Sequence, residues 1–199
     1  MKYKFCVSGT ADAGICTEEV LRRVEQVGEE IVRQDGMLVT GATTGAPYRA
    51  AVGAKRAGGF VVGFSPAGSE LEHVKKYRLP LDNHDVVVYT GFGYAGRNLL
   101  LTRSADAVII VSGRIGTLNE FTIAFEDKKP IGVLTSTGGT ADMIADLVKE
   151  SRRGLGKIVY DDNPEALIKK LTELIDREKV VIGELEAFSV NEKLNVGTQ

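Results

Sequence analysis

The stretch AVIIVSGRIGTLNE, residues 107–120, passes from a strand pattern into a helix pattern. Its first part is a continuous run of Ala, Val and Ile, which is typical of a strand covered on both faces, as in a parallel sheet. Its second part carries Gly113 and Gly116 and then opens a helix at Thr117. A buried strand that leads through a glycine-bearing turn into a helix predicts one unit of an α/β fold.

The same alternation continues over most of the chain. Short Val- and Ile-rich runs predict strands, and the longer amphipathic segments between them predict helices. Repeated strand–helix–strand units need right-handed crossovers, which predicts a three-layer α/β fold with a mostly parallel twisted sheet flanked by helices. The expected strands are Tyr3–Ser8, Met37–Thr40, Phe60–Phe64, Val86–Thr90, Ala107–Val111, Ile131–Leu134 and Lys157–Tyr160. The expected helices are Thr17–Gln34, Pro47–Ala57, Tyr94–Ser104, Leu118–Glu126, Thr140–Ser151 and Pro164–Glu178.

Length and composition predict one globular domain over residues 1–179. Hydrophobic residues make up 43% of the chain and charged residues 26%, which is ordinary for such a domain. Residues 70–85 are less regular and predict a loop or short helix over one end of the sheet. The tail, residues 180–199, has little periodicity, and its role stays open between surface packing, contact with a partner and mobility.

Charge, cysteines and histidines argue against several classes of protein. The net charge of −2 carries no electrostatic signature of a nucleic-acid partner. Two cysteines, Cys6 and Cys16, without a secretory signal favour a cytoplasmic location, and no apolar run reaches the length of about 18 residues that a membrane span needs. His73 and His84 have no partner at metal-ligand spacing, so we expect no metal and interpret both as surface or turn residues. No cofactor is expected.

The ligand site is expected beyond the carboxyl ends of the strands, where the strand order of an open parallel sheet reverses. Four segments follow predicted strands there: residues 8–11, 41–46, 91–98 and 112–117. Their glycines, hydroxyls and Arg side chains predict a site for a phosphate-bearing small molecule, with a nucleotide as the expected class. The candidate binding residues are Ser8, Gly9, Gly41, Thr43, Thr44, Gly45, Arg97, Asn98, Gly113, Arg114, Gly116 and Thr117.

Each signal also has a structural interpretation. The turn before Thr117 offers backbone N–H groups to an anion, but Thr117–Glu120 also has the form of a capping box in which Glu120 is only a cap. The loop at residues 41–46 is neither a Walker loop nor a dinucleotide fingerprint, and its glycines also suit a plain strand-to-helix turn. Arg97 could clamp a phosphate or form a surface ion pair.

Together these residues resemble the Lonely Guy (LOG) family, which also carries the label "possible lysine decarboxylase", within a superfamily of Rossmann-like nucleotide binders. The family pattern has an Arg-Lys pair, a Ser-Asp-Ala strand entry and Pro-Gly-Gly-x-Gly-Thr-x-x-Glu. In this sequence Arg97-Asn98, Ala105-Asp106-Ala107 and residues 112–120 stand at these places, with Glu120 lying 23 positions after Arg97. The likeness covers about residues 3–160.

The resemblance implies a dimeric Rossmann-like fold. In active members it implies hydrolysis of the N-glycosidic bond of nucleoside 5′-monophosphates, with Arg97 and Glu120 as the catalytic pair. The decarboxylase label finds no pyridoxal-phosphate lysine motif in this chain.

Three residues depart from the family pattern. Asn98 replaces Lys and removes a charge, Ser112 replaces Pro, and Arg114 replaces a Gly where the phosphate would approach. The Arg114 side chain could block that approach or supply the missing charge. The alternative to a hydrolase is therefore a non-catalytic nucleotide-binding or molybdenum-cofactor-type carrier protein. A DNA-processing adaptor has less support, because the sequence has no basic face.

Overall fold

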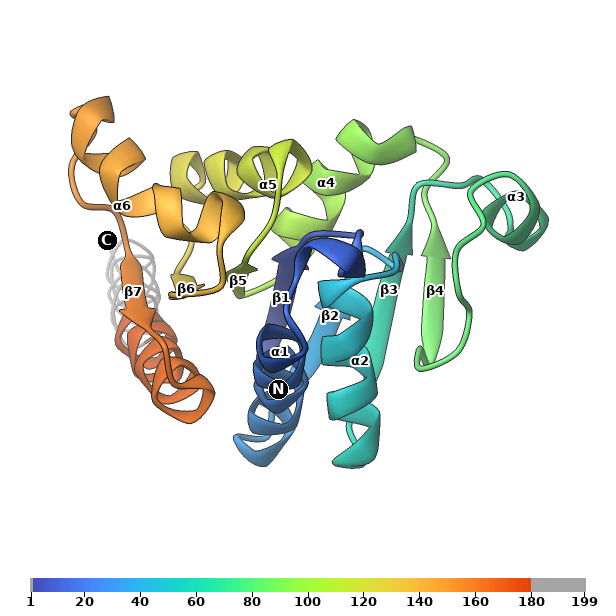
Figure 1. Cartoon of the computed structure of the whole chain (residues 1–199), viewed down its shortest axis with the longest axis horizontal. Helices are drawn as coiled ribbons and strands as arrows, with labels where there is room; N and C mark the ends of the chain where they lie inside the picture. Colours follow the sequence, from blue (N-terminus) through green and yellow to red (C-terminus); the bar gives the residue numbers. More distant parts are fainter. Residues whose placement is uncertain (1, 180–199) are drawn as a thin grey trace, which may run out of the picture.

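The computed structural model describes residues 2–179, and the predicted tail at residues 180–199 lies outside this part. Seven strands of the described chain form one sheet in the order β4-β3-β2-β1-β5-β6-β7, and every neighbouring pair is parallel (Figure 1). The predicted parallel α/β sheet is confirmed. The strands are β1 (Lys4–Gly9), β2 (Met37–Thr40), β3 (Val61–Ser65), β4 (Val86–Tyr89), β5 (Ala107–Val111), β6 (Ile131–Leu134) and β7 (Ile158–Asp161).

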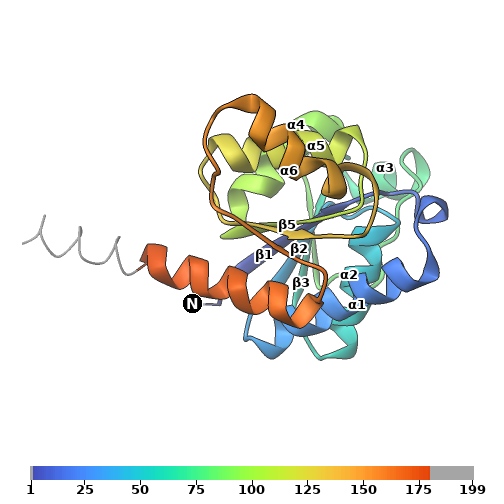
Figure 2. The same cartoon turned by 60° about the vertical axis from the view of Figure 1, so that its left-hand side comes forward.

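Helices cover both faces of the sheet, which gives the three predicted layers (Figure 2). On one face α1, α2 and a last helix at residues 164–179 enclose a core that includes Phe5, Ile31 and Ile168. On the other face α4, α5 and α6 enclose a second core around Leu101 and Phe121. The labelled helices are α1 (Glu18–Arg33), α2 (Ala46–Arg56), α3 (Glu70–Lys75), α4 (Gly93–Ser104), α5 (Ile115–Glu126) and α6 (Gly139–Ser151), with a short 3-10 turn at Ala13–Ile15.

The direction in which the sheet grows reverses at β1. Val7 in β1 lies opposite Thr40 of β2 on one side and Ile109 of β5 on the other. From β1 the chain builds β2, β3 and β4 outward on one side, and then crosses back to build β5, β6 and β7 on the other. The loops after β1 and β5 therefore separate toward opposite faces, which is where open parallel sheets bind their ligands.

Helix α5 begins earlier than predicted, and the capping-box interpretation of Thr117 and Glu120 is wrong. The residue at the N-cap is Arg114, in extended backbone and without a side-chain cap, and Leu118 N donates to Arg114 O at 3.0 Å. Thr117 therefore lies inside the helix. The turn closes early because Ser112 and Gly113 both adopt positive φ, +48° and +100°.

His73 is not a surface or turn residue as predicted, while His84 directly follows the turn at residues 82–83. His73 is completely buried and His84 is half-buried. Hydroxyl groups at strand ends supply their partners: Ser65 of β3 lies 2.8 Å from His73 Nδ1, and Thr40 of β2 lies 2.8 Å from His84 Nε2. The contact between Thr40 and His84 joins residues 44 positions apart, so residue spacing gave no sign of it.

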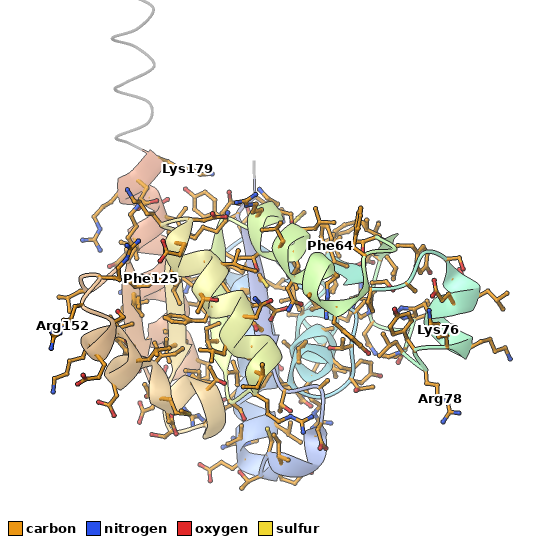
Figure 3. The ribbon with its side chains drawn as sticks, turned by 90° about the horizontal axis from the view of Figure 1, so that it is seen from above. Phe64, Lys76, Arg78, Phe125, Arg152 and Lys179 are labelled. Carbon is orange, nitrogen blue, oxygen red and sulfur yellow. The ribbon has the colours of Figure 1, made fainter. Side chains whose placement is uncertain are left out.

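The cationic side chains are spread over the molecule. Figure 3 shows Lys76 and Arg78 at the end that carries α3, and Arg152 and Lys179 at the opposite end. These four cations therefore do not share one face. Between residues 2 and 179, no helix has the length and apolar character that crossing a membrane requires.

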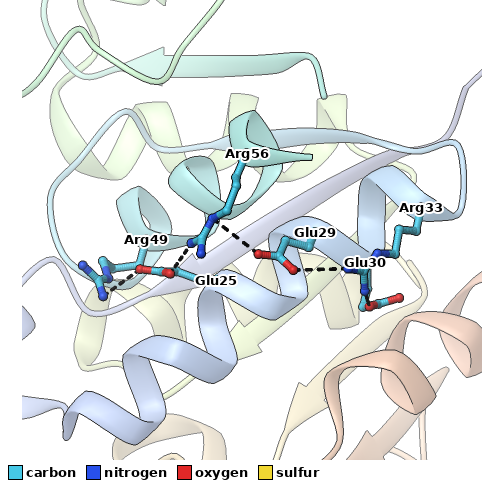
Figure 4. Close-up of polar contacts among 6 residues, drawn as sticks. All are labelled: Glu25, Glu29, Glu30, Arg33, Arg49 and Arg56. Atoms are coloured by element: carbon cyan, nitrogen blue, oxygen red, sulfur yellow. Dashed lines mark hydrogen bonds and ion pairs between the residues drawn. The ribbon is translucent and has the colours of Figure 1, made fainter. Parts of the chain in front are cut away.

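Helices α1 and α2 pack at very close range because each presents a glycine to the other. A Cβ on Gly28 would overlap the carbonyl oxygen of Ala50, and a Cβ on Gly53 would overlap that of Glu25. At the edge of this contact Arg49 Nη2 lies 2.6 Å from Glu25 Oε1, and Arg56 pairs with the same carboxylate (Figure 4). Backbone proximity and a shared carboxylate thus fix the pair of helices.

Gly53→Ala should lower the free energy of unfolding by about 1–3 kcal/mol, because the backbone of α1 must move away from the new methyl group. Urea denaturation would measure the change. The matched control is Gly116→Ala in α5, where a Cβ meets open space and stability should be unchanged or slightly higher. Equal stability of Gly53→Ala and the wild type would show that the two helices can separate freely.

Candidate functional site

A crevice of about 190 Å³ opens at the carboxyl ends of β1 and β5, where the sheet reverses direction. All four segments predicted from the sequence contribute to it. Each segment supplies at least two of the lining residues. The lining residues are Val7, Gly9, Thr10, Ala11, Gly41, Thr43, Pro47, Tyr94, Arg97, Asn98, Arg114, Gly116, Thr117 and Glu120.

Nine of the predicted site residues line this crevice, and four have another place. Ser8 lies beneath it and binds Glu120. Thr44 donates to the Ala11 carbonyl at 2.7 Å, which fastens the loop that follows β2 to the loop that follows β1. Gly45 and Gly113 have φ of +74° and +100°, so they shape the two loops. Sequence reasoning missed five lining residues, of which three stand within the quoted segments: Val7, Thr10, Ala11, Pro47 and Tyr94.

Glu120 is held in a defined orientation at the floor of the crevice. Its side chain comes from the second turn of α5, and the residue is only 7% exposed. Ser8 Oγ donates to Oε2. The amide of Asn98, oriented to match its neighbours, donates from Nδ2 to Glu120 Oε1 and to the Tyr94 carbonyl, both at 2.9 Å. Asn98 thus positions this carboxylate in addition to lining the crevice.

Burial raises the pKa of the Glu120 carboxyl above its ordinary value. The Arg97 guanidinium and the hydrogen bond from Ser8 act in the opposite direction and favour the carboxylate. A buried carboxyl between these opposing effects, inside a crevice, is typical of groups that perform acid–base or charge-stabilising work.

Arg97 is buried, so its interpretation as a surface ion pair is wrong. The residue is 5% exposed, and its Nε has no hydrogen-bond partner within the part of the chain that the structure describes. Its guanidinium occupies the space that a Cβ on Gly41 would fill, and it lies 5.8 Å from the Tyr94 ring centroid. Burial lowers the Arg97 pKa while Glu120 raises it, and an Arg stays protonated in proteins. The crevice therefore holds a buried cation with an unused donor.

The start of α5 also lines the crevice, through Arg114, Gly116 and Thr117. Leu118 N is bonded to Arg114 O, so the backbone N–H groups of residues 115–117 precede the first bonded turn of the helix. A Cβ on Gly116 would meet nothing within 4 Å, which leaves the approach to these N–H groups open. Arg114 has extended backbone with φ of −130°, which any residue adopts, and its side chain is 62% exposed. Arg114 Nη1 lies 3.9 Å from Asp12 Oδ2, and Arg114 is itself one of the residues that line the crevice.

The parallel sheet, the crevice at its reversal point and the open helix start define a Rossmann-like protein of the nucleotide- and cofactor-binding class. The chain belongs to the SLOG cluster4 family, whose model matches residues 2–168. The resemblance predicted from residues 97–120 is confirmed at the level of the family.

Similar proteins cover most of the chain. An uncharacterized protein of Archaeoglobus fulgidus is 36% identical over 126 residues, which are 63% of this chain and 78% of the relative. The molybdenum cofactor binding protein of Rippkaea orientalis is 25% identical with a TM-score of 0.72, covering 88% of this chain and 98% of that one. The molybdenum cofactor carrier protein of Chlamydomonas reinhardtii is 23% identical with a TM-score of 0.71, covering 88% and 99%.

Proposed function

We propose that this chain binds a nucleoside 5′-monophosphate in the crevice and hydrolyses its N-glycosidic bond. The observation that carries the proposal is the pair of buried, oppositely charged side chains that line the crevice, Glu120, which is held by two hydrogen bonds, and Arg97. A buried carboxylate and a buried guanidinium are costly to maintain without a task or a partner. The family resemblance assigns the same two positions to catalysis.

The 5′-phosphate would rest on the start of α5. The N–H groups of residues 115–117 and the helix dipole favour an anion there, and Gly116 leaves room for it. Arg114 would add a positive charge at the rim, which offsets the charge that Asn98 removes from the family pattern. The crevice volume of about 190 Å³ is below the 300–1,000 Å³ usual for ligand pockets, so part of the nucleotide would extend outside.

In hydrolysis the bond between C1′ of the ribose and the base nitrogen breaks, the oxygen of a water molecule bonds to C1′, and a proton from that water ends on the base nitrogen. The transition state resembles an oxocarbenium ion, by analogy with glycoside hydrolysis. The Glu120 carboxylate would stabilise this cation or orient the attacking water, and Arg97 would hold the substrate. Fixed charges placed where the transition state develops charge are an effective source of catalysis.

The direct test is incubation of the purified protein with a panel of nucleoside 5′-monophosphates, followed by chromatography of the released base. Calorimetry with the same compounds measures binding separately. Release of free base supports the hydrolase. Binding without release would overturn it.

Gly116→Ala tests the phosphate position without disturbing the fold. A Cβ at Gly116 meets no protein atom within 4 Å and projects over the helix start. We therefore expect unchanged melting but an affinity for nucleoside monophosphates that is lower by about tenfold or more, a loss of about 1.4 kcal/mol. Calorimetry beside thermal melting measures both. Unchanged affinity would place the phosphate elsewhere.

The second candidate is a carrier that holds a molybdenum-cofactor-type ligand without converting it. It is favoured by the similarity to the R. orientalis and C. reinhardtii proteins over 88% of this chain. Such a ligand also carries a phosphate group, so the start of α5 would serve both functions. Binding of nucleotides without release of base would favour this carrier. The homodimer implied by the family also stays a prediction, and sedimentation velocity would test it.

A further inference from the structure

His84 is connected to the crevice through one hydroxyl group. Its Nδ1 lies 2.9 Å from the carbonyl oxygen of Asp82, and its Nε2 lies 2.8 Å from Thr40 Oγ1. A carbonyl oxygen can only accept, so Nδ1 carries the hydrogen and Nε2 of the neutral ring accepts from the Thr40 hydroxyl. The hydroxyl oxygen in turn accepts from Ala42 N at 3.1 Å.

This chain of hydrogen bonds ends in a strained residue beside the crevice. Ala42 has φ of +49°, a left-handed conformation that costs an L-residue free energy. Its neighbours Gly41 and Thr43 line the crevice. Beneath it, a Cβ on Gly63 would come within 2.8 Å of both Ala42 Cβ and His84 Cδ2, so β3 carries a glycine where the ring and the turn meet.

We propose that His84 is a positioning residue for the crevice, holding the turn at residues 41–43 in its ligand-binding conformation through Thr40 and releasing it in mild acid. Because this role depends on the binding site proposed above, it concerns the regulation of that site. Protonation of Nε2 turns an acceptor into a donor. The Thr40 hydroxyl oxygen would then face two N–H groups, those of His84 and Ala42, while its own hydrogen would have no acceptor. Thr40 is only 1% exposed, so water cannot replace the lost acceptor.

The charged and titratable groups around His84 come from three elements. Asp82 and Asp85 lie on its own segment, His73 lies on α3, and Lys55 of α2 pairs with Asp85 at 2.7 Å. Tyr48 of α2 donates to Asp82 at 2.6 Å. Burial and His73 lower the pKa of His84, while the Asp82 carbonyl, Asp82 and Asp85 oppose the change, and burial is the largest effect.

The direction of the pH effect follows from this lowered pKa. As the pH falls, His84 is protonated at about pH 6.5 in the unfolded chain and only at a lower pH in the folded protein. Between the two pKa values the unfolded state binds more protons, so the contribution of His84 to stability is complete above about pH 6.5 and decreases as the pH falls. The hydrogen bonds through which His84 and Thr40 position residues 41–43 weaken likewise as the pH falls.

His73 provides a matched control within the same chain. Its Nδ1 pairs with Ser65 Oγ and its Nε2 lies 3.0 Å from the Pro80 carbonyl, while Ser65 Oγ accepts from Ala67 N at 3.0 Å. A histidine thus pairs with a hydroxyl at the end of β3 in the same way that His84 pairs with a hydroxyl at the end of β2. Neither Ser65 nor Ala67 lines the crevice, so His73 has no hydrogen-bond path to the ligand. Because His73 also lowers the pKa of His84, His73→Gln should keep the loss of affinity in acid and move it to slightly higher pH.

The test measures binding of adenosine 5′-monophosphate by calorimetry from about pH 7.5 to about pH 5, in wild type, His84→Gln and His73→Gln. Gln cannot titrate but can still donate and accept. Since the ligand phosphate also titrates, with a pKa of about 6, the variants are compared with wild type at each pH. We expect wild type and His73→Gln to lose about tenfold more affinity in acid than His84→Gln. Parallel profiles for wild type and His84→Gln would overturn the proposal.

A second measurement needs no ligand. Amide deuterium exchange of the peptide spanning residues 39–45 should be faster in Thr40→Val than in wild type at neutral pH, and His73→Gln should match wild type. Equal exchange in Thr40→Val and wild type would overturn the role of Thr40 and His84. If the wild type fails to bind nucleotide at neutral pH but these exchange differences appear, the proposed ligand is wrong and the positioning of the turn stands.

Discussion

Glu120→Gln should lower turnover of a nucleoside 5′-monophosphate by at least about a hundredfold while leaving binding nearly intact. The amide keeps the shape of the carboxylate, and its oxygen can still accept from Ser8. Asn98 can turn its own amide to match the new nitrogen. What the substitution removes is the negative charge that stabilises a ribosyl cation, and a ligand in its ground state carries no such cation.

Single-turnover assays with chromatography of the released base measure the chemical step, and calorimetry measures binding. The matched control is Glu126→Gln on the same helix, whose carboxylate pairs at the surface with Arg153 at 2.9 Å and should be neutral to both readouts. Full turnover in Glu120→Gln would remove Glu120 from catalysis even if the protein is a hydrolase.

The pH dependence of the same reaction gives an independent check. Burial raises the pKa of Glu120 above its ordinary value of 4.5. If the carboxylate is the working form, turnover should fall as the pH drops through this raised pKa, because protonation removes the charge. A rate that increases toward acid would instead assign Glu120 the role of a general acid.

The sequence predicted the layers and most elements because their signals are local. The continuous apolar run at residues 107–111 indicates a strand covered on both faces. The helical spacing of apolar residues at residues 18–33 indicates which face of that helix packs on the sheet. The candidate site followed from the same logic, since parallel strands bring their carboxyl ends to one edge. Tyr94 stood inside a quoted segment, but no local signal separated it from its neighbours.

Contacts between distant segments were beyond this reasoning. The capping box at Thr117 matched a real pattern, yet the positive φ of Ser112 and Gly113 let the helix begin earlier, and Glu120 was left free to meet Ser8. The burial of His84 depends on Thr40, 44 positions away. Arg97 is buried because Gly41, on another loop, has no side chain.

Arg97→Ala should weaken nucleotide binding by about tenfold to a hundredfold, the equivalent of one charge-assisted contact of about 1.5–3 kcal/mol. Arg97 lines the crevice and is 5% exposed, so a bound phosphate or ribose oxygen would meet a guanidinium that is already largely desolvated. Arg97→Lys should recover only part of the affinity, because an ammonium lacks the planar pair of donors. Calorimetry measures affinity, and melting confirms that each variant is folded.

Gly41→Ala moves the Arg97 guanidinium without removing it, and so tests whether its position matters. The φ of Gly41 is not positive, so an alanine fits the backbone, but its Cβ would overlap Arg97 Nη1 and must displace the group. If the placement of the charge matters, Gly41→Ala should lose affinity in the same direction as Arg97→Ala while every charge of the protein is retained. If Arg97→Ala weakens binding and Gly41→Ala does not, the guanidinium acts as a mobile charge. If neither variant changes affinity, the ligand does not use this wall of the crevice, and the reaction proposed for Glu120 loses its substrate anchor.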